Sequence, residues 1–304
     1  MTDDTYLEQI DWKRGGPELY RVRHEVFVRE QQVPEELEQD DRDPLSHHVL
    51  ARDAQGRPVA TGRLLPDGHI GRLAVLAPWR GRGLGRRVLL KLLLLARERN
   101  MERVELNAQF QALDFYRELG FEPFGEEFME AGIRHRAMAL SLAGPVPLTG
   151  YLRVRDALLT LGQELWRSLE FYLPVVEPRL LDDQDWLALL GRRLNARPRL
   201  QVRLLLPRAE QWRRDCPRLG QLRQTLPTRL ELRTLSPEAI QERAQGLQGF
   251  AIFDKGPLLH LSDPCRLVGQ LHLRGGPLTR DLLGLFAESW EKGGEDMELR
   301  RLGI

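Results

Sequence analysis

Cysteine and long apolar runs are scarce in this sequence. Its 304 residues include two cysteines, Cys216 and Cys265, which form no Cys-x-x-Cys pair. Neither a disulfide framework nor a zinc or other metal site is therefore expected, and a reducing compartment is favoured. An apolar run such as 92–96 is far shorter than the ~20 residues that span a bilayer. The acidic start, residues 1–4, is unlike a signal peptide. We expect a cytoplasmic protein that has no membrane partner.

Charge of one sign is also scarce. The chain has 45 Lys and Arg against 44 Asp and Glu, a net charge of +1. Residues 1–147 carry 21 basic and 24 acidic side chains, and residues 148–304 carry 24 and 20. Neither half has the strong basic excess of a dedicated nucleic-acid binder. The 42% of hydrophobic residues is typical of a globular protein, and the length favours two domains.

Proline and glycine mark a boundary near the middle of the chain. Residues 144–150 contain two of each and no charge, which predicts a linker between a domain at 1–143 and a domain at 151–304. On both sides, strand-like and helix-like segments alternate, which indicates an α/β architecture. The strands expected before the linker are 48–52, 58–64, 71–76, 104–107 and 134–141, and the helices are 86–99 and 111–119. After the linker, the expected strands are 171–175, 200–206, 229–233 and 250–254, and the helices are 153–169, 182–194, 219–225 and 279–291.

A glycine-rich loop follows the strand at 71–76. Gly81, Gly83 and Gly85 allow a tight turn in which successive N–H groups point the same way at a helix start. Such a site binds anions such as a pyrophosphate. The loop lacks the Lys-Ser/Thr of a P-loop and the G-x-G-x-x-G of a nicotinamide site. The alternative is a loop that only lets the helix pack on the strand.

Three segments together resemble the GNAT superfamily of N-acetyltransferases. Residues 80–85, Arg-Gly-Arg-Gly-Leu-Gly, are similar to its acetyl-CoA motif R/Q-x-x-G-x-G/A. Residues 112–121 are similar to its second signature, A-x-x-F-Y-x-x-L-G-F. Residues 23–34 resemble the opening R-x-x-V-F-V-x-E-Q-x-V-P of the ElaA-like branch. The resemblance covers residues 15–141 and implies a mixed, splayed β-sheet flanked by helices.

The resemblance also implies an activity, in which an amine attacks acetyl-CoA directly in a ternary complex. The strand before the loop would pair with the pantetheine arm, the loop would hold the pyrophosphate, and Tyr116 would protonate the departing thiolate. The expected residues for the cofactor acetyl-CoA are Leu73, Ala74, Val75, Arg80, Gly81, Arg82, Gly83, Leu84, Gly85, Arg86 and Gln109. The alternative is a catalytically silent acetyl-CoA sensor that acts through the second domain.

The base that deprotonates the amine stays open. Glu105 lies on the strand after the long helix, and His47 and His48 lie at a strand start, where histidine titrates near neutral pH. A water relay is a further alternative. The sequence therefore offers Glu105 and His48 as candidate catalytic residues beside Tyr116.

An acidic segment at 30–43 suggests the acceptor. It holds seven acidic residues against a single arginine, which predicts a rim that attracts a cationic amine. Glu30, Glu36 and Asp40 are the expected substrate residues, and a polyamine, a lysine-like molecule or a basic protein tail would suit them. The alternative is a solvated loop.

The second half resembles one half of a phospholipase D-like fold, on the segments 202–206, 250–254 and 285–291. The catalytic signature H-x-K-x-x-x-x-D is missing, because Arg274 follows His272 and Thr279 stands where the aspartate belongs. We therefore expect a non-catalytic α/β sandwich domain. Its expected role is to bind a nucleic acid or a protein partner through the arginines of 192–203, to form a homodimer, or to cover the acceptor site. The alternative for these arginines is a solvated surface.

Overall fold

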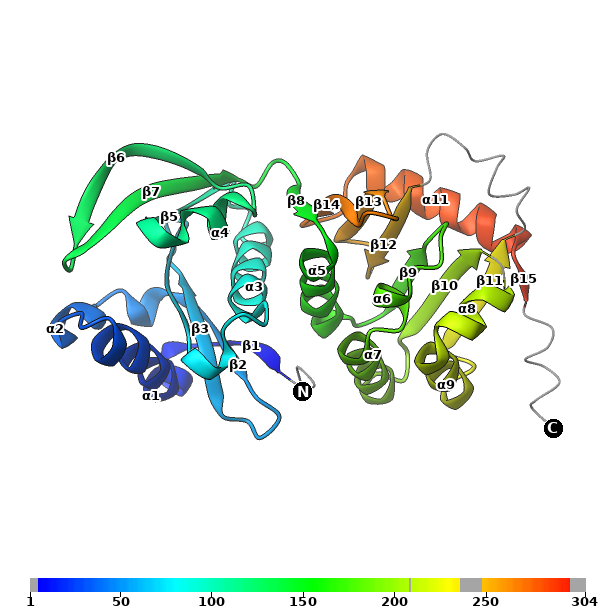
Figure 1. Ribbon diagram of the computed structural model, residues 1–304, viewed down its shortest axis with the longest axis horizontal. Coiled ribbons are helices and arrows are strands. Elements are labelled where there is room, and N and C mark those ends of the chain that lie inside the picture. Colours follow the sequence, from blue (N-terminus) through cyan, green and yellow to red (C-terminus); the bar gives the residue numbers. More distant parts are fainter. Residues whose placement is uncertain (1–4, 208, 236–247, 296–304) are drawn as a thin grey trace. The chain divides into compact units, whose positions relative to one another are not determined.

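The computed structural model (Figure 1) describes residues 5–207, 209–235 and 248–295. The chain divides into two compact units between Pro147 and Leu148. Each unit has its own β-sheet, so the α/β fold class expected from the sequence is confirmed. None of the helices in the described part of the chain combines the length and apolar character that a membrane span requires.

The first unit holds a seven-stranded sheet in the order β1-β2-β3-β4-β5-β7-β6. Its strands are β1 (Tyr6–Ile10), β2 (His47–Arg52), β3 (Pro58–Leu64), β4 (His69–Val75), β5 (Arg103–Gln109), β6 (Glu122–Glu130) and β7 (Ile133–Ser141). Its α-helices are α1 (Trp12–Arg23), α2 (Glu35–Glu38), α3 (Leu84–Glu98) and α4 (Leu113–Arg117). A π-helical segment, η1 (His24–Glu30), follows α1. The segments η2 (Asp43–Leu45), η3 (Ala77–Trp79) and η4 (Phe110–Ala112) are 3-10 helices.

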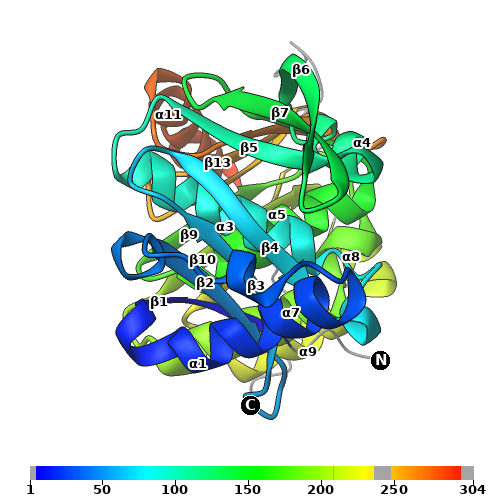
Figure 2. The ribbon, with the colours of Figure 1, turned by 90° about the vertical axis from the view of Figure 1, so that its left-hand side faces the viewer.

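The helices α1 and α3 cover opposite faces of this sheet (Figure 2). On one face, Val22 and Val26 of α1 and η1 pack against Ala74 of β4. On the other face, Leu73 of β4 lies beside α3, since a Cβ added to Gly62 of β3 would touch Leu73 and two side chains of α3. Burial of α3 on nearly all sides confirms what its continuous apolar sequence predicts.

The second unit holds an eight-stranded sheet in the order β15-β11-β10-β9-β12-β13-β14-β8. Its strands are β8 (Val146–Thr149), β9 (Ser168–Tyr172), β10 (Gln201–Pro207), β11 (Leu230–Leu235), β12 (Gly249–Phe253), β13 (Leu258–Asp263), β14 (Val268–His272) and β15 (Gly294–Glu295). Its helices are α5 (Tyr151–Glu164), α6 (Pro178–Leu181), α7 (Gln184–Ala196), α8 (Ala209–Asp215), α9 (Pro217–Thr225) and α11 (Pro277–Lys292). The core on one face is closed by α11, whose Phe286 and Trp290 pack on Phe250 and Tyr172.

Several expectations for this half differ from the structure, among them the linker and the first helix. Part of the expected linker forms strand β8, which lies beside β14. The helix expected to reach residue 169 ends at Glu164, and β9 begins at Ser168. The Asp254 carboxylate accepts hydrogen bonds from the backbone N–H groups of residues 166, 167 and 168. This long-range contact turns the chain, and apolar spacing within the helix gives no sign of it.

Candidate active site

The sheet of the first domain opens between β4 and β5, which run parallel. The two strands pair at only two positions, His69 with Glu105 and Ile70 with Leu106. Within the described residues the ladder does not continue beyond Ile70, so the strands diverge toward their carboxyl ends. Backbone N–H and C=O groups need partners, and a strand that has lost its neighbour on one side offers them to a ligand.

Val75, the last residue of β4, turns its backbone toward this opening. It lies opposite Ala60 of β3, and the next residue, Leu76, donates its N–H to Val59 O at 3.0 Å. In such a ladder, the N–H and C=O of Val75 point away from β3. By the same alternation, the backbone groups of Ala74 point toward β3. Of the expected pantetheine contacts, Val75 is therefore placed toward the opening and Ala74 is not.

The glycine-rich loop between β4 and α3 has a left-handed backbone at two glycines. Gly81 has a φ of +74° and Gly83 a φ of +82°, values that cost little only in glycine. Gly83 is the N-cap of α3 and has no side chain to cover the first turn. A Cβ added to Gly81 would meet no atom within 4 Å. The loop is therefore open at Gly81, and its left-handed glycines before a helix start fit a phosphate group.

Arg80 begins this loop, and groups of the same chain hold its guanidinium. Nη1 donates to Glu30 Oε1 and Nη2 donates to Glu30 Oε2, both at 2.6 Å. Nε donates to Val75 O at 2.9 Å. The hydrogen bond from Arg80 lowers the pKa of Glu30 from its usual value. An expected donor-binding residue and an expected acceptor-binding residue are thus brought together at the end of β4.

The other residues of the loop have different surroundings. The Arg82 guanidinium lies 5.1 Å from the centroid of the Trp79 ring, and Arg86 Nη2 lies 3.7 Å from a carboxylate oxygen of Glu118. Leu84 is buried and anchors the start of α3. A Cβ added to Gly85 would lie 3.5 Å from the Val75 side chain, at ordinary contact distance. Leu84 and Gly85 can therefore offer only backbone groups to a ligand.

Gln109 ends β5, on the other side of the opening. Its Nε2 donates to Gln31 Oε1 at 2.9 Å, and Gln111 Nε2 donates to Gln109 Oε1 at 3.1 Å. Gln31 directly follows Glu30, so two consecutive residues contact the loop after β4 and the end of β5. Sequence reasoning did not select Gln31 as a site residue. The signal was its place in the Glu-Gln pair of the opening segment at 23–34.

Tyr116 lies on α4 between two aromatic rings. Its ring centroid is 5.0 Å from that of Phe115 and 5.9 Å from that of Phe121, both edge to face. Burial raises the pKa of Tyr116 to about 12. The phenol is therefore protonated at neutral pH and is available as a proton donor. Its catalytic role stays a prediction.

The candidate bases lie in contrasting surroundings. β5 alternates between buried and accessible positions, so Glu105 shares a face with Asn107 and Gln109. The Glu105 side chain is 45% exposed and lies 3.0 Å from Arg103 Nη2. Glu105 is thus open to solvent on the strand that borders the opening.

Both histidines are held by other groups of the domain. His48 is 1% exposed, with Nε2 at 2.9 Å from Asp43 O and its ring 5.4 Å from that of Trp12. Burial lowers the pKa of His48. His47 accepts a hydrogen bond from Arg99 at 2.6 Å, and burial together with this cation lowers its pKa. The structure therefore favours Glu105 over His48 for contact with an incoming amine.

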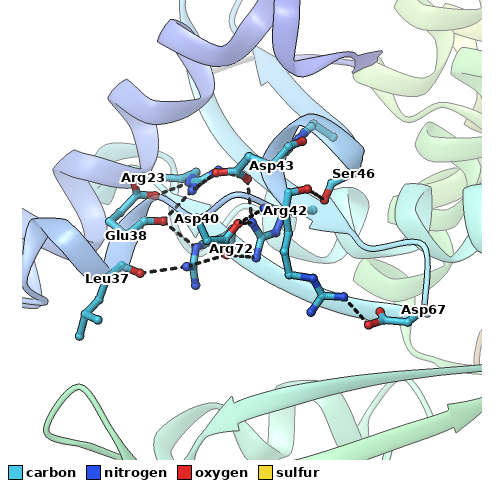
Figure 3. A network of polar contacts seen from close by, with 11 residues as sticks. Arg23, Leu37, Glu38, Asp40, Arg42, Asp43, Ser46, Asp67 and Arg72 are labelled. Atoms are coloured by element: carbon cyan, nitrogen blue, oxygen red, sulfur yellow. Dashed lines mark hydrogen bonds and ion pairs between the residues drawn. The ribbon is translucent and has the colours of Figure 1, made fainter.

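Much of the acidic segment at 30–43 is paired with arginines inside the domain (Figure 3). Arg23 of α1 contacts Asp43 through Nη1 and Nη2, at 2.8 and 2.9 Å, and also binds the Glu38 carboxylate. The side chains of Arg23 and Glu38 are 0% exposed, and that of Asp43 is 1% exposed. These carboxylates are unavailable to a substrate.

Asp40 belongs to the same network. Its two oxygens accept hydrogen bonds from Arg63 Nη1 and Nη2 at 2.6 and 2.8 Å, and Arg72 Nη2 lies at 3.4 Å. The expectation that Asp40 stands on an open acidic rim is at odds with this placement, because β-strand arginines neutralise its charge. Glu36 is exposed, and Glu30 pairs with Arg80. Arg63 and Arg72 were not anticipated from the sequence.

Comparison with known proteins agrees with this geometry. Residues 6–142 match the family model described as acetyltransferase (GNAT) domain, and residues 152–302 match a domain of unknown function (DUF7931). The likeness of the second half to a phospholipase D-like fold is not shown by this match and stays a prediction.

Three relatives resemble the first domain. The uncharacterized protein YyaT of Bacillus subtilis is 35% identical over 143 residues, which are 45% of this chain and 96% of YyaT. The uncharacterized N-acetyltransferase YjcF of Bacillus subtilis is 38% identical over 125 residues, 40% of this chain and 89% of YjcF. The crystal structure of Escherichia coli ElaA is 28% identical, covering 44% of this chain and 98% of ElaA with a TM-score of 0.41.

The family model spans residues 6–142, which include the splayed sheet and its glycine-rich loop, and together with the two Bacillus subtilis relatives it confirms the resemblance of the N-terminal half. A domain of this kind transfers an acyl group from CoA. Through its N-terminal domain, this chain belongs to the GNAT family of acetyltransferases.

Proposed function

We propose that the first domain transfers the acetyl group of acetyl-CoA to a primary amine. The observation that carries this proposal is the continuous path formed by the opening and the loop. The Val75 backbone faces the opening, and the left-handed glycines Gly81 and Gly83 follow at the start of α3. A pantetheine arm requires backbone partners and a pyrophosphate requires N–H groups, and this path supplies them in that order. Leu73, Arg82, Arg86 and Gln109 complete the proposed donor site.

The proposed reaction is one direct displacement. The lone pair of the amine nitrogen forms a bond with the thioester carbonyl carbon, and the C–S bond breaks. Tyr116 donates its phenolic proton to the departing thiolate. The amine loses a proton to Glu105, directly or through water, and Glu105 passes it on to solvent. Tyr116 regains a proton from solvent after CoA leaves. General acid and base steps of this kind contribute typically 10²–10⁴-fold each.

For the acceptor we propose a cationic amine. Glu36 of α2 is exposed, which supports an acidic approach to the site from this segment. Asp40 contributes by holding this segment in place through Arg63 and not by direct contact. A polyamine, a lysine-like molecule and a basic peptide are the acceptor classes to screen.

Calorimetry of the full chain with acetyl-CoA, desulfo-CoA and longer acyl-CoA thioesters tests the donor. Micromolar binding that prefers the acetyl thioester supports the proposal, and absence of binding by the folded chain contradicts it. Turnover of any amine in the panel supports the enzyme. Tight binding of acetyl-CoA without turnover in the whole panel would favour a sensor that acts through the second domain.

The second domain is proposed to be an accessory, partner-binding domain in a cytoplasmic protein. We propose a phospholipase D-like layout for this domain. Thr279, which stands where the signature requires an aspartate, instead accepts a hydrogen bond from Gly276 N at 3.4 Å at the start of α11, so the acid–base pair is absent. Arg197 stacks on the exposed Trp166 at 3.8 Å, a surface suited to a nucleic acid or an acidic protein. A gel shift across a salt series tests the first partner, and light scattering tests a homodimer.

A further inference from the structure

The ion pair between Arg80 and Glu30 joins two segments that are 50 residues apart in the sequence. Arg80 is the first residue of the glycine-rich loop, and Glu30 is the last residue of η1. Both terminal nitrogens of the guanidinium contact the carboxylate, and the third nitrogen, Nε, contacts Val75 O. While this ion pair exists, neither the Arg80 guanidinium nor the Val75 carbonyl of the proposed CoA site is available to a ligand.

The carboxylate of Glu30 has the chemistry of the group that this loop is built to bind. A carboxylate and a phosphate both accept two parallel hydrogen bonds from one guanidinium. Among the described residues, Arg80 is the cation that contacts Glu30, since the neighbouring Arg29 contacts Glu25 at 3.3 Å. Glu30 thus provides an internal anion for Arg80 when no phosphate is bound.

The ion pair between Arg80 and Glu30 is weak enough for a phosphate to replace Glu30. The side chains of Arg80 and Glu30 are 41% and 44% exposed. Exposed ion pairs of this kind are weak, and they open readily. A pyrophosphate offers more charge than one carboxylate, so it competes well for the guanidinium. When Arg80 turns to the phosphate, Val75 O also loses its hydrogen bond from Nε and becomes free to accept one from a ligand.

We propose that Glu30 competes with the pyrophosphate of CoA for Arg80, and that it thereby sets the affinity of the domain for its donor. This inference rests on the proposed function, because it requires that CoA binds at the Arg80 loop. It assigns Glu30 to control of donor binding, whereas its position in an acidic segment suggested contact with the amine. Release of Glu30 also loosens the end of η1, which Gln31 links to Gln109 of β5.

Calorimetry with CoA tests the competition. In Glu30→Gln the competing charge is gone, so the dissociation constant for CoA should fall about two- to fivefold, as expected for loss of an exposed ion pair. Glu25→Gln is the matched control, since it removes the same charge from the same element but contacts Arg29. Its dissociation constant should stay near that of the wild type.

A double-mutant cycle shows whether Glu30 acts through Arg80. Arg80→Gln alone should weaken CoA binding about tenfold or more, since the pair of a guanidinium and a phosphate is lost. Adding Glu30→Gln to Arg80→Gln should then change nothing. Hydrogen exchange gives a second readout. CoA should speed exchange in residues 24–33 of the wild type, and in Glu30→Gln these residues should exchange faster before CoA is added.

These measurements distinguish failure of the Glu30 competition from failure of the proposed function. If the wild type binds CoA but Glu30→Gln binds it no more tightly than Glu25→Gln, the competition is refuted and the proposed function stands. An equal gain in the Arg80→Gln background also refutes it. If no folded variant binds CoA, the proposed function fails and this inference fails with it.

Discussion

Arg23 and Asp43 form a bidentate ion pair in the interior of the first domain. Nη1–Oδ1 is 2.8 Å, Nη2–Oδ2 is 2.9 Å, and both side chains are almost fully buried. Arg63 of β3 reaches the same Asp43 oxygen, Oδ1, at 2.7 Å. The pair therefore ties α1 to β3 through the segment that follows α2. Because η1 and Glu30 lie between α1 and that segment, the network positions the residues that approach the glycine-rich loop.

Replacing Asp43 with Asn should strongly destabilise the first domain. The substitution leaves Arg23 and Arg63 short of one buried negative charge, and loss of one partner of a buried pair costs about 3–5 kcal/mol. Urea unfolding, with hydrogen exchange in residues 12–46 to identify the domain, measures the loss. Asp41→Asn is the matched control, because Asp41 is exposed two residues away and should change stability by less than about 0.5 kcal/mol. Equal stability of the two variants would contradict the structural role of the pair.

Acid should remove the same stabilisation. Burial favours protonation of Asp43, but Arg23 and Arg63 outweigh it and keep the pKa of Asp43 below its ordinary 3.8. A depressed carboxyl pKa stabilises the fold above the unfolded value and loses that effect as pH falls through the folded value. The difference in unfolding free energy between wild type and Asp43→Asn should therefore be constant from pH 7 to 5 and shrink below about pH 4. A difference that stays constant down to pH 2 would refute this assignment.

The sequence predicted the elements whose signals are local. The strands expected at 48–52 and 58–64 and the helix expected at 86–99 lie close to the observed bounds of β2, β3 and α3. The helix α3 ends before Asn100, whose left-handed φ of +57° is typical of a residue just past a helix end. The strands β1, β6, β13 and β14 were missed. β1 pairs with β2, far along the chain, and β6 is exposed along most of its length, so its sequence carries no apolar alternation.

In the candidate active site, only the glycine-rich backbone motif could be predicted from the sequence. The glycines of the loop are set by the local turn, so Gly81 and Gly83 could be selected from spacing alone. The charges could not be assigned in the same way. Asp40 and Glu30 look alike in a run of acidic residues, and only the folded sheet shows that Arg63 pairs with one and Arg80 with the other. Long-range pairing therefore decides which carboxylate is available.

Replacing Gly83 with Glu should abolish CoA binding without unfolding the domain. The new side chain would place a negative charge at the N-cap of α3, where the pyrophosphate is expected. Calorimetry should show at least a hundredfold weaker binding, or none. Gly132→Glu is the control, because Gly132 also has a positive φ of +77° and open space around it, on the β6–β7 turn. It shares the backbone strain of about 1 kcal/mol and should bind CoA normally. Normal binding by Gly83→Glu would remove the loop from the donor site.

Glu105→Gln distinguishes the candidate bases. If Glu105 accepts the amine proton, kcat should fall about 10²-fold or more while CoA affinity is unchanged. His48→Gln serves as the comparison, since His48 is buried and should affect stability more than kcat. An unchanged kcat in Glu105→Gln, with a normal pH profile, would transfer the role to a water relay.

Replacing Tyr116 with Phe should remove the acid and leave the donor site intact. The aromatic packing against Phe115 and Phe121 persists without the hydroxyl, so folding and CoA affinity should change little. The rate of acetyl transfer should fall about 10²-fold or more, because the thiolate then leaves unprotonated. Since burial raises the pKa of Tyr116 to about 12, the wild-type rate should show no loss from this group up to about pH 10.

Tyr151→Phe is the matched control in the second domain, where the hydroxyl donates to Asp183 at 2.6 Å, and it should leave kcat unchanged. A full rate in Tyr116→Phe would show that the thiolate leaves without this proton, and the acid would then have to be sought among the groups that face the opening from β5.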